Sequence, residues 1–195
     1  MEIRRFDVPG PVVVTPRRFG DARGWFCETW NREAWSAAGL ALPEFVQDNH
    51  SFSAARHTLR GLHYQRPPHA QAKLVRCSRG AVLDVAVDVR RGSPHFGQSV
   101  VVELSAQTGA QLFVPVGFLH GFLTLTDDCE VQYRCSDRYA PDCDGAVRWD
   151  SAGIDWGLPP GAAPVLSDKD AGAIPFAAFD TPFVFEEQGR DRTVP

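Results

Sequence analysis

Residues 59–73 read LRGLHYQRPPHAQAK and concentrate polar side chains between segments that have a β-strand pattern. The stretch holds two histidines, two glutamines, a tyrosine and one of the only two lysines in the chain. A core strand has no use for this many polar groups, because burying each one costs free energy unless it finds a partner. We therefore interpret the stretch as carrying the base of an acid–base site inside a barrel-like β-sandwich.

The sequence on either side has the pattern of short antiparallel strands. Residues 82–89 alternate between two sets of side chains with the period of two that a half-buried strand needs. Further strands are expected at residues 12–14, 24–30, 98–104, 110–114, 117–125 and 129–135, separated by turn residues. The pattern predicts an all-β fold, a double-sheet antiparallel jelly roll.

Two segments depart from the strand pattern. Asn31 is a predicted N-cap for one short helix over residues 32–38, which Gly39 would end. After Tyr139 the chain becomes a loop-rich C-terminal segment, which Trp149 and Trp156 are expected to anchor. We find no repeat or linker, so residues 1–195 are predicted to form a single domain, with residues 185–195 as a flexible tail.

Composition narrows the classes of function. The net charge of −4 gives no reason to expect nucleic acid or a membrane surface as a partner, and no apolar run is long enough to cross a bilayer. The five cysteines form no CxxC pair, which favours a reducing, cytoplasmic location over a disulfide framework. A zinc site built from the last three cysteines is an alternative, although their spacing fits no common pattern.

A second spacing pattern points to a known superfamily. Gly109, Pro115, Gly117 and His120 have the spacing of the second cupin motif. In metal-dependent cupins this histidine joins two histidines and a glutamate from a first motif. Here the first motif is altered, because Gln65 replaces the second histidine and Lys73 replaces the glutamate. An ammonium group repels a divalent cation and attracts an oxyanion, so we expect no metal and no cofactor.

Several motifs in the same order resemble the dTDP-4-dehydrorhamnose 3,5-epimerase family. They are FGDARGWFCE, FVQDNHSFS, LRGLHYQ with Lys73, GSPHFG, FVPVGFLHGF, Tyr133 with Tyr139, and LSDKD at residues 166–170. The resemblance implies a cupin-type isomerase that acts on a dTDP-4-keto-6-deoxyhexose. It would invert C3 and C5 of dTDP-4-dehydro-6-deoxy-D-glucose through an enolate and give dTDP-4-dehydro-L-rhamnose for L-rhamnose biosynthesis.

The resemblance also implies roles for individual residues. His63 matches the base, whose unperturbed pKa of about 6.5 suits reversible proton transfer. Asp170 matches the carboxylate that orients this imidazole, and Tyr133 matches the acid on the opposite face of the sugar. Lys73 and His120 match groups that stabilise the enolate oxygen.

A larger set matches positions that hold the nucleotide and the sugar. It comprises Arg23, Glu28, Gln47, Asp48, Asn49, Arg60, Lys73, His120, Tyr139, Asp144 and Lys169. Tyr139 would stack on the thymine ring, and Asp144 stands where the family usually has the longer glutamate. Members of the family are homodimers that exchange strands across the interface, so we expect a homodimer here.

Several alternatives remain open. The function could be a mono-epimerase acting at C3 or C5 alone, a metal-dependent cupin oxygenase or isomerase, or a non-catalytic sugar-nucleotide sensor. His120 could be a core histidine, and Asp168 competes with Asp170 for the role beside His63. Asp84 and Asp88 fit a polar strand face, and we assign them no catalytic role.

Strand parity raises one further question. It separates Arg60 from His63 unless Gly61 forms a bulge or the strand begins after Arg60.

Overall fold

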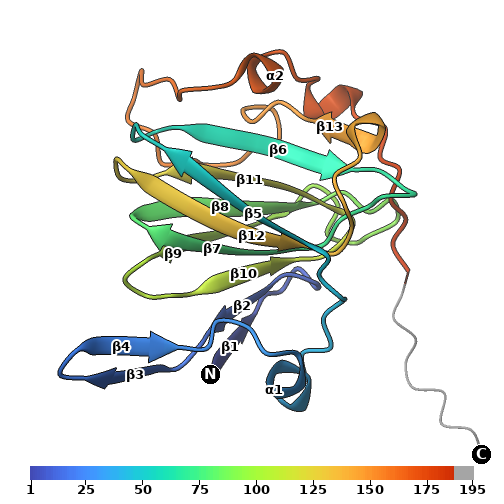
Figure 1. Ribbon diagram of the computed structural model, residues 1–195. Helices are drawn as coiled ribbons and strands as arrows, with labels where there is room; N and C mark the ends of the chain where they lie inside the picture. Colours follow the sequence, from blue (N-terminus) through green and yellow to red (C-terminus); the bar gives the residue numbers. More distant parts are fainter. Residues whose placement is uncertain (187–195) are drawn as a thin grey trace, which may run out of the picture.

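The structure, a computed structural model, describes residues 1–186 as two packed antiparallel sheets and a separate hairpin (Figure 1). The six-stranded sheet has the order β1 (Glu2–Arg5), β2 (Val12–Thr15), β10 (Gln111–Val114), β7 (Lys73–Arg79), β12 (Cys129–Cys135) and β5 (Gln47–Ser53). The five-stranded sheet has the order β13 (Asp144–Ala146), β6 (Leu59–Gln65), β11 (Phe118–Thr124), β8 (Ala81–Asp88) and β9 (Ser99–Ser105). The predicted double-sheet jelly roll is confirmed.

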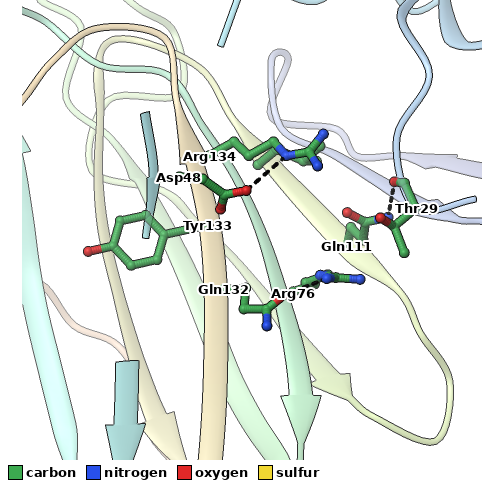
Figure 2. Close-up of a pocket in the computed structure, with 8 residues that line it drawn as sticks. Thr29, Asp48, Arg76, Gln111, Gln132, Tyr133 and Arg134 are labelled. Atoms are coloured by element: carbon green, nitrogen blue, oxygen red, sulfur yellow. Dashed lines mark hydrogen bonds and ion pairs between the residues drawn. The ribbon is translucent and has the colours of Figure 1, made fainter. Parts of the chain in front are cut away.

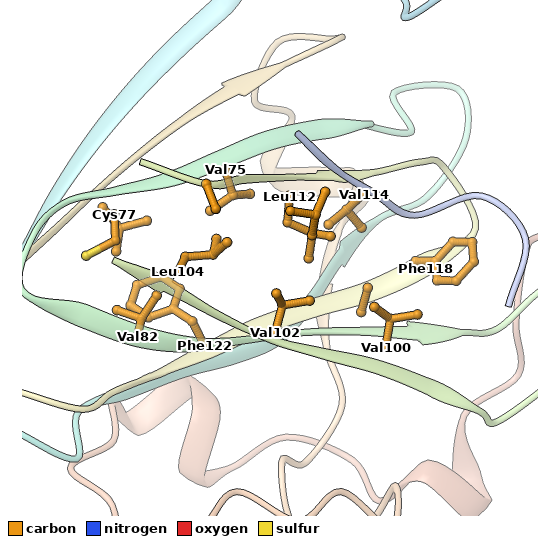
Figure 3. Packing of buried hydrophobic residues seen from close by; sticks show 14 of the residues in the cluster. Val75, Cys77, Val82, Val100, Val102, Leu104, Leu112, Val114, Phe118 and Phe122 are labelled. Carbon is orange, nitrogen blue, oxygen red and sulfur yellow. The ribbon is translucent and has the colours of Figure 1, made fainter. Parts of the chain in front are cut away.

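The main core lies between the two sheets. Leu112 and Val75 from the six-stranded sheet face Leu104, Val82 and Phe122 from the other sheet, as Figure 3 shows. All of these side chains are buried, and β9 contributes the alternate residues Val100, Val102 and Leu104 to the same cluster. The inner faces of the sheets therefore supply the main apolar core of the protein.

Both outer faces are partly covered as well. The loop-rich C-terminal segment places Val147, Trp156 and Phe183 against Val85 and Leu119 on the outer face of the five-stranded sheet. The predicted anchor is present, since Trp156 belongs to this cluster and Trp149 packs against it. Nε1 of Trp156 also donates to the carbonyl of Trp149 at 3.0 Å. On the other side of the molecule, α1 (Arg32–Ala37) packs through Trp35 on the six-stranded sheet.

This second layer corrects the sequence interpretation of β8. The strand is not half-buried, because its outward side chains are covered by the C-terminal segment and its inward ones by the six-stranded sheet. Asp84 and Asp88 are completely buried and do not form a polar surface. Asp88 is paired with Arg90 and accepts a hydrogen bond from Ser93, whereas Asp84 belongs to the site described below.

The short elements follow local chemistry. The side chain of Asn31 accepts a hydrogen bond from the backbone N–H of Ala34 at 3.1 Å, as expected for an N-cap, so the predicted helix is confirmed to within one residue. A second helix, α2 (Asp168–Ala171), begins at the N-cap Ser167 and was not anticipated. Two 3₁₀ turns occupy Pro141–Cys143 and Phe176–Ala178. No helix among residues 1–186 is long and apolar enough to cross a membrane.

The separate hairpin and the start of the predicted tail lie outside the two sheets. The hairpin of β3 (Arg18–Asp21) and β4 (Gly24–Cys27) projects away from the sandwich in Figure 1. The predicted tail at residues 185–195 lies almost entirely outside the described residues. At its start, the N–H of Phe185 donates to the carbonyl of Arg91 at 2.9 Å.

A bulge at Gly61 settles the question of strand parity. His63 lies opposite His120 and Arg60 opposite Phe122, so β6 has one residue more than β11 in this interval. Leu59 and Leu62 consequently both face the outer core although they are three positions apart. Of the two possibilities left open by the sequence, the bulge is the one that occurs.

We expect Gly61→Ala to destabilise the protein by roughly 3 kcal/mol, the combined cost of overpacking and of a positive φ at a non-glycine residue. A Cβ at this position would lie 2.6 Å from Cα of Gly121, and φ is +131°. Urea denaturation measures the loss. Gly20→Ala is the matched control, because its Cβ would meet nothing nearer than 3.6 Å, and it should change the stability by less than about 0.5 kcal/mol. Equal stability of the two variants would contradict this account of β6.

Candidate active site

A polar cavity of about 390 Å³ opens at the end of the sandwich where the apolar core stops. It lies among β5, β6, β7, β12, β13 and α2, and most of its lining residues belong to the predicted site. They are Gln47, Asn49, His63, Tyr64, Gln65, Gln71, Lys73, Tyr133, Tyr139, Asp144 and Lys169. Period-two geometry explains the convergence, since the inward positions of neighbouring strands must face the same space.

His63 is held by a buried carboxylate. Its Nε2 lies 2.5 Å from Oδ1 of Asp170, whose side chain is 3% exposed. Asp168 in the same helix is exposed, so Asp170 is the one of the two carboxylates that reaches the imidazole. Burial alone would raise the pKa of Asp170, but the hydrogen bond and the charge of His63, with help from Ser167 and Gly61, leave that pKa below its ordinary value.

This pairing fixes the tautomer of the neutral form of His63. An ionised carboxylate can only accept hydrogen bonds, so Nε2 carries the proton and Nδ1 keeps a free lone pair. Nδ1 makes no hydrogen bond with any residue in the range 1–186, and His63 lines the cavity. The arrangement is that of a general base whose orientation is set by a third group.

Lys73 and Tyr133 stand beside His63 in the cavity. Nζ of Lys73 lies 5.9 Å from the ring centroid of Tyr133 and has no hydrogen-bond partner among the described residues. Burial lowers the pKa of Lys73, against the charges of Cys135, Asp144 and Asp84. Burial also raises the pKa of Tyr133, so its hydroxyl keeps the proton at neutral pH. His63 therefore presents an acceptor to the cavity, and Lys73 and Tyr133 present donors.

A second histidine–carboxylate pair lies next to the first, on the neighbouring strand β11 and its other neighbour β8. His120 is the backbone partner of His63, and its Nε2 lies 2.9 Å from Oδ1 of Asp84. His120 is 7% exposed and does not line the cavity, so it is a buried histidine, but one paired with a carboxylate. Within residues 1–186, Oδ2 of Asp84 is the buried side-chain atom that has no hydrogen-bond partner.

At the mouth of the cavity Asp144 is already engaged. It pairs with Lys169, and the hydroxyl of Tyr139 donates to its Oδ2 at 3.3 Å. These three residues come from β13, α2 and the loop after β12. Asp144 is thus bonded to two other predicted binding residues, Lys169 and Tyr139.

Besides Asp170 and His120, four predicted residues do not line the cavity of this chain. Arg60 is on the inner face, where its guanidinium donates to Ser53 and to the carbonyl of Phe52. Asp48 alternates with Gln47 and Asn49 and so faces outward, toward Arg134. Figure 2 shows the ring of Tyr133 pointing away from the ion pair of Asp48 and Arg134.

Arg23 and Glu28 are exposed residues in and just after the projecting hairpin.

Sequence reasoning did not assign Tyr64, Gln65 and Gln71, which line the cavity, or Asp84, which pairs with His120. Asp84 could not be assigned to His120 without the β8–β11 register, which pairs His120 with Ala86 and Phe122 with Asp84. Among the described residues no group of three or more His, Cys, Asp or Glu side chains is placed to hold a metal ion.

The fold and this cavity define a cupin-type protein with a site suited to proton transfer. Comparison with known proteins gives the family directly, because the dTDP-4-dehydrorhamnose 3,5-epimerase family matches residues 5–178. The chain belongs to this family of isomerases.

Individual relatives agree in sequence and in structure. The epimerase of Sinorhizobium fredii is 49% identical over 82% of this chain and 81% of its own length, and that of Escherichia coli is 46% identical over 87% and 91%. The crystal structure of the Legionella pneumophila enzyme in complex with dTDP-4-keto-L-rhamnose has a TM-score of 0.85 and 38% identity, covering 92% of this chain and 94% of that one. A 3′-monoepimerase from Streptomyces bikiniensis, bound to dTDP-quinovose, has a TM-score of 0.79 and 38% identity over 88% and 86%.

Removing the carboxylate from the first pair should make stability depend less on pH. Since the pKa of Asp170 is lowered on folding, its contribution is present above the unfolded pKa of about 3.9 and disappears as the pH falls through the folded pKa. We expect Asp170→Asn to lose roughly 2 kcal/mol at pH 7 and much less at low pH. Chemical denaturation across this pH range measures the difference. The control is Asp168→Asn at an exposed position, whose free energy of unfolding should stay within about 1 kcal/mol of that of the parent at every pH. An equally small change in Asp170→Asn would contradict the stabilising role of the Asp170 carboxylate.

Proposed function

We propose that this chain inverts C3 and C5 of dTDP-4-dehydro-6-deoxy-D-glucose and so produces dTDP-4-dehydro-L-rhamnose. The observation that carries the proposal is the placement of His63, oriented by Asp170, in one cavity with the protonated Tyr133. Membership of the family and the nucleotide-sugar ligands of solved relatives support the substrate class.

The first step uses the free lone pair of His63. The C4 ketone acidifies the hydrogens on C3 and C5, and Nδ1 removes one of them as a proton. The C–H electron pair forms the double bond of the enolate and its charge moves to the oxygen on C4. Asp170 stabilises the imidazolium that results, because the bonded carboxylate is held below its ordinary pKa.

The enolate oxygen is stabilised by Lys73. The ammonium has no carboxylate bonded to it in the described part of the chain, and burial lowers its pKa, so a developing oxyanion is a favourable partner. Tyr133 then donates its phenolic proton to the carbon from the opposite face, which inverts the centre. The proton held by His63 leaves to solvent, solvent restores the phenol, and the cycle repeats at the second carbon.

Proton exchange with solvent tests this assignment. Turnover in deuterated buffer should place deuterium on both C3 and C5, and His63→Ala should lower kcat by about 10²–10⁴-fold. His50→Ala is the matched control, because His50 is exposed on the outer face of β5 and pairs with Glu130. NMR of the sugar ring measures the exchange. Deuterium at one carbon alone would identify a mono-epimerase, and its absence at both would overturn the proposal.

We also propose that the working form is a homodimer in which the β3–β4 hairpin completes the cavity of the partner. Arg23 and Glu28 lie on or beside this projecting hairpin and do not line the cavity of their own chain. Trp25 and Phe26 on the same hairpin are 61% and 69% exposed, and large aromatic side chains of this kind usually gather at interfaces.

Co-expression of two defective variants tests the exchange. His63→Ala removes the base, and Arg23→Ala removes the cation on the hairpin. If the hairpin acts on the partner, each mixed dimer has one intact site, and the mixture should recover roughly a quarter of the wild-type sites. Each variant expressed alone is the control. No recovery in dimers shown to be mixed would mean that Arg23 acts within its own chain.

We further propose that the enzyme works in the cytoplasm. All five cysteines are free thiols, and four of them are buried. Free thiols are typical of proteins that work in a reducing compartment.

A further inference from the structure

The segment of residues 137–140, which follows β12, has no regular secondary structure and is held by glutamine side chains. The carbonyls of Asp137 and Arg138 accept hydrogen bonds from amide NH₂ groups, and the N–H groups of Tyr139 and Ala140 donate to amide oxygens. Backbone groups beside a cavity need such partners when no neighbouring strand supplies them. Three side-chain amides therefore take the place of a sheet ladder.

Gln65 makes two of these four bonds. Its Nε2 donates to the carbonyl of Arg138 at 3.0 Å and to that of His69 at 2.5 Å, and its Oε1 accepts from the N–H of Ala140 at 2.9 Å. The residue is 4% exposed, so both amide hydrogens are used within the protein. Although it lines the cavity, Gln65 has no donor left for a ligand.

Two glutamines from other elements complete the arrangement. Oε1 of Gln47 in β5 accepts from the N–H of Tyr139 at 2.8 Å, and Nε2 of Gln71 donates to the carbonyl of Asp137 at 2.7 Å. The amide of Gln47 is oriented in turn by its bond to Asn49 at 3.0 Å. The three glutamines thus connect β5, β6 and the loop before β7 to the same short segment.

The segment carries the aromatic ring at the cavity mouth. Tyr139 is 55% exposed, and its hydroxyl is bonded to Asp144, which also pairs with Lys169. An exposed ring with little apolar packing keeps its direction only if its backbone is fixed, and here the glutamines fix it. A flat face held in this way beside cationic groups suits the base of a nucleotide.

We propose that Gln65 is a positioning residue that, with Gln47 and Gln71, holds Tyr139 where the base of the nucleotide-sugar stacks. The proposal rests on the proposed function for its ligand. It also gives a use for the glutamine that stands at a metal-ligand position of the cupin pattern, since that amide is committed to the loop that carries Tyr139.

The test is a double-variant cycle between Gln65→Glu and Tyr139→Ala, read as the Kd of thymidine diphosphate by calorimetry. Glutamate keeps the size of glutamine but presents oxygen lone pairs to two carbonyls. We expect Gln65→Glu to raise the Kd about tenfold with Tyr139 present, because two buried acceptors lose their donors, and less than about twofold with Tyr139→Ala. KM should rise in parallel, while kcat at saturation falls less than about threefold.

Gln107→Glu is the matched control, because Gln107 is exposed and the substitution makes the same change of charge. An unchanged Kd in folded Gln65→Glu, or an equal loss in both Tyr139 backgrounds, would overturn the positioning role. If Gln65→Glu does not fold, Gln71→Met replaces it in the same cycle. We then expect the Kd of thymidine diphosphate to rise about threefold when Tyr139 is present and to stay unchanged in the Tyr139→Ala background. Failure of the wild type to bind thymidine diphosphate would refute the proposed substrate, whereas binding without coupling would refute the positioning role alone.

Discussion

The extra residue at Gly61 decides which side chains of β6 reach the cavity. Without it, strict alternation would place Arg60 on the face opposite His63, and the pairing with β11 would shift by one residue. With it, Leu59 and Leu62 both pack under the C-terminal segment while His63 and Gln65 face inward. The tight approach of Gly61 to Gly121 makes this register possible, so the base, its neighbouring glutamine and the outer core depend on the same contact.

The site combines a rigid acceptor with a cation that has no bonded counter-charge. His63 obtains its orientation from Asp170, which lies in α2 far along the chain. Asp170 is buried, so a rearrangement of His63 would leave its carboxylate unpaired. Lys73 lies in the same space with no carboxylate bonded to it among residues 1–186, which prepares the cavity for negative charge on the substrate. The His120–Asp84 pair, one strand away, adds a second fixed carboxylate whose charge acts on Lys73.

Much of the fold could be predicted because it depends on local periodicity, whereas the centre of the site was predicted from the family motifs. Alternation identified most strands, and the motif residues His63, Lys73 and Tyr133 do meet in one cavity. Partners that depend on register were not accessible. Asp84 was misjudged because the apolar side of β8 packs under loops without any period, so that Asp84 lies on the inner face of the sheet. The four-residue helix α2 is too short to show a pattern. The outward position of Asp48 follows from parity, but the family motif includes it alongside its inward neighbours.

The central claim is that His63 and Tyr133 act on opposite faces of one sugar ring. A crystal structure with an unreactive thymidine-diphosphate sugar tests it most directly. We predict that the sugar lies in the cavity with C3 and C5 within about 3.5 Å of Nδ1 of His63, the Tyr133 hydroxyl on the other face and the C4 substituent toward Lys73. A sugar bound with both residues on the same face, or bound outside this cavity, would contradict the account.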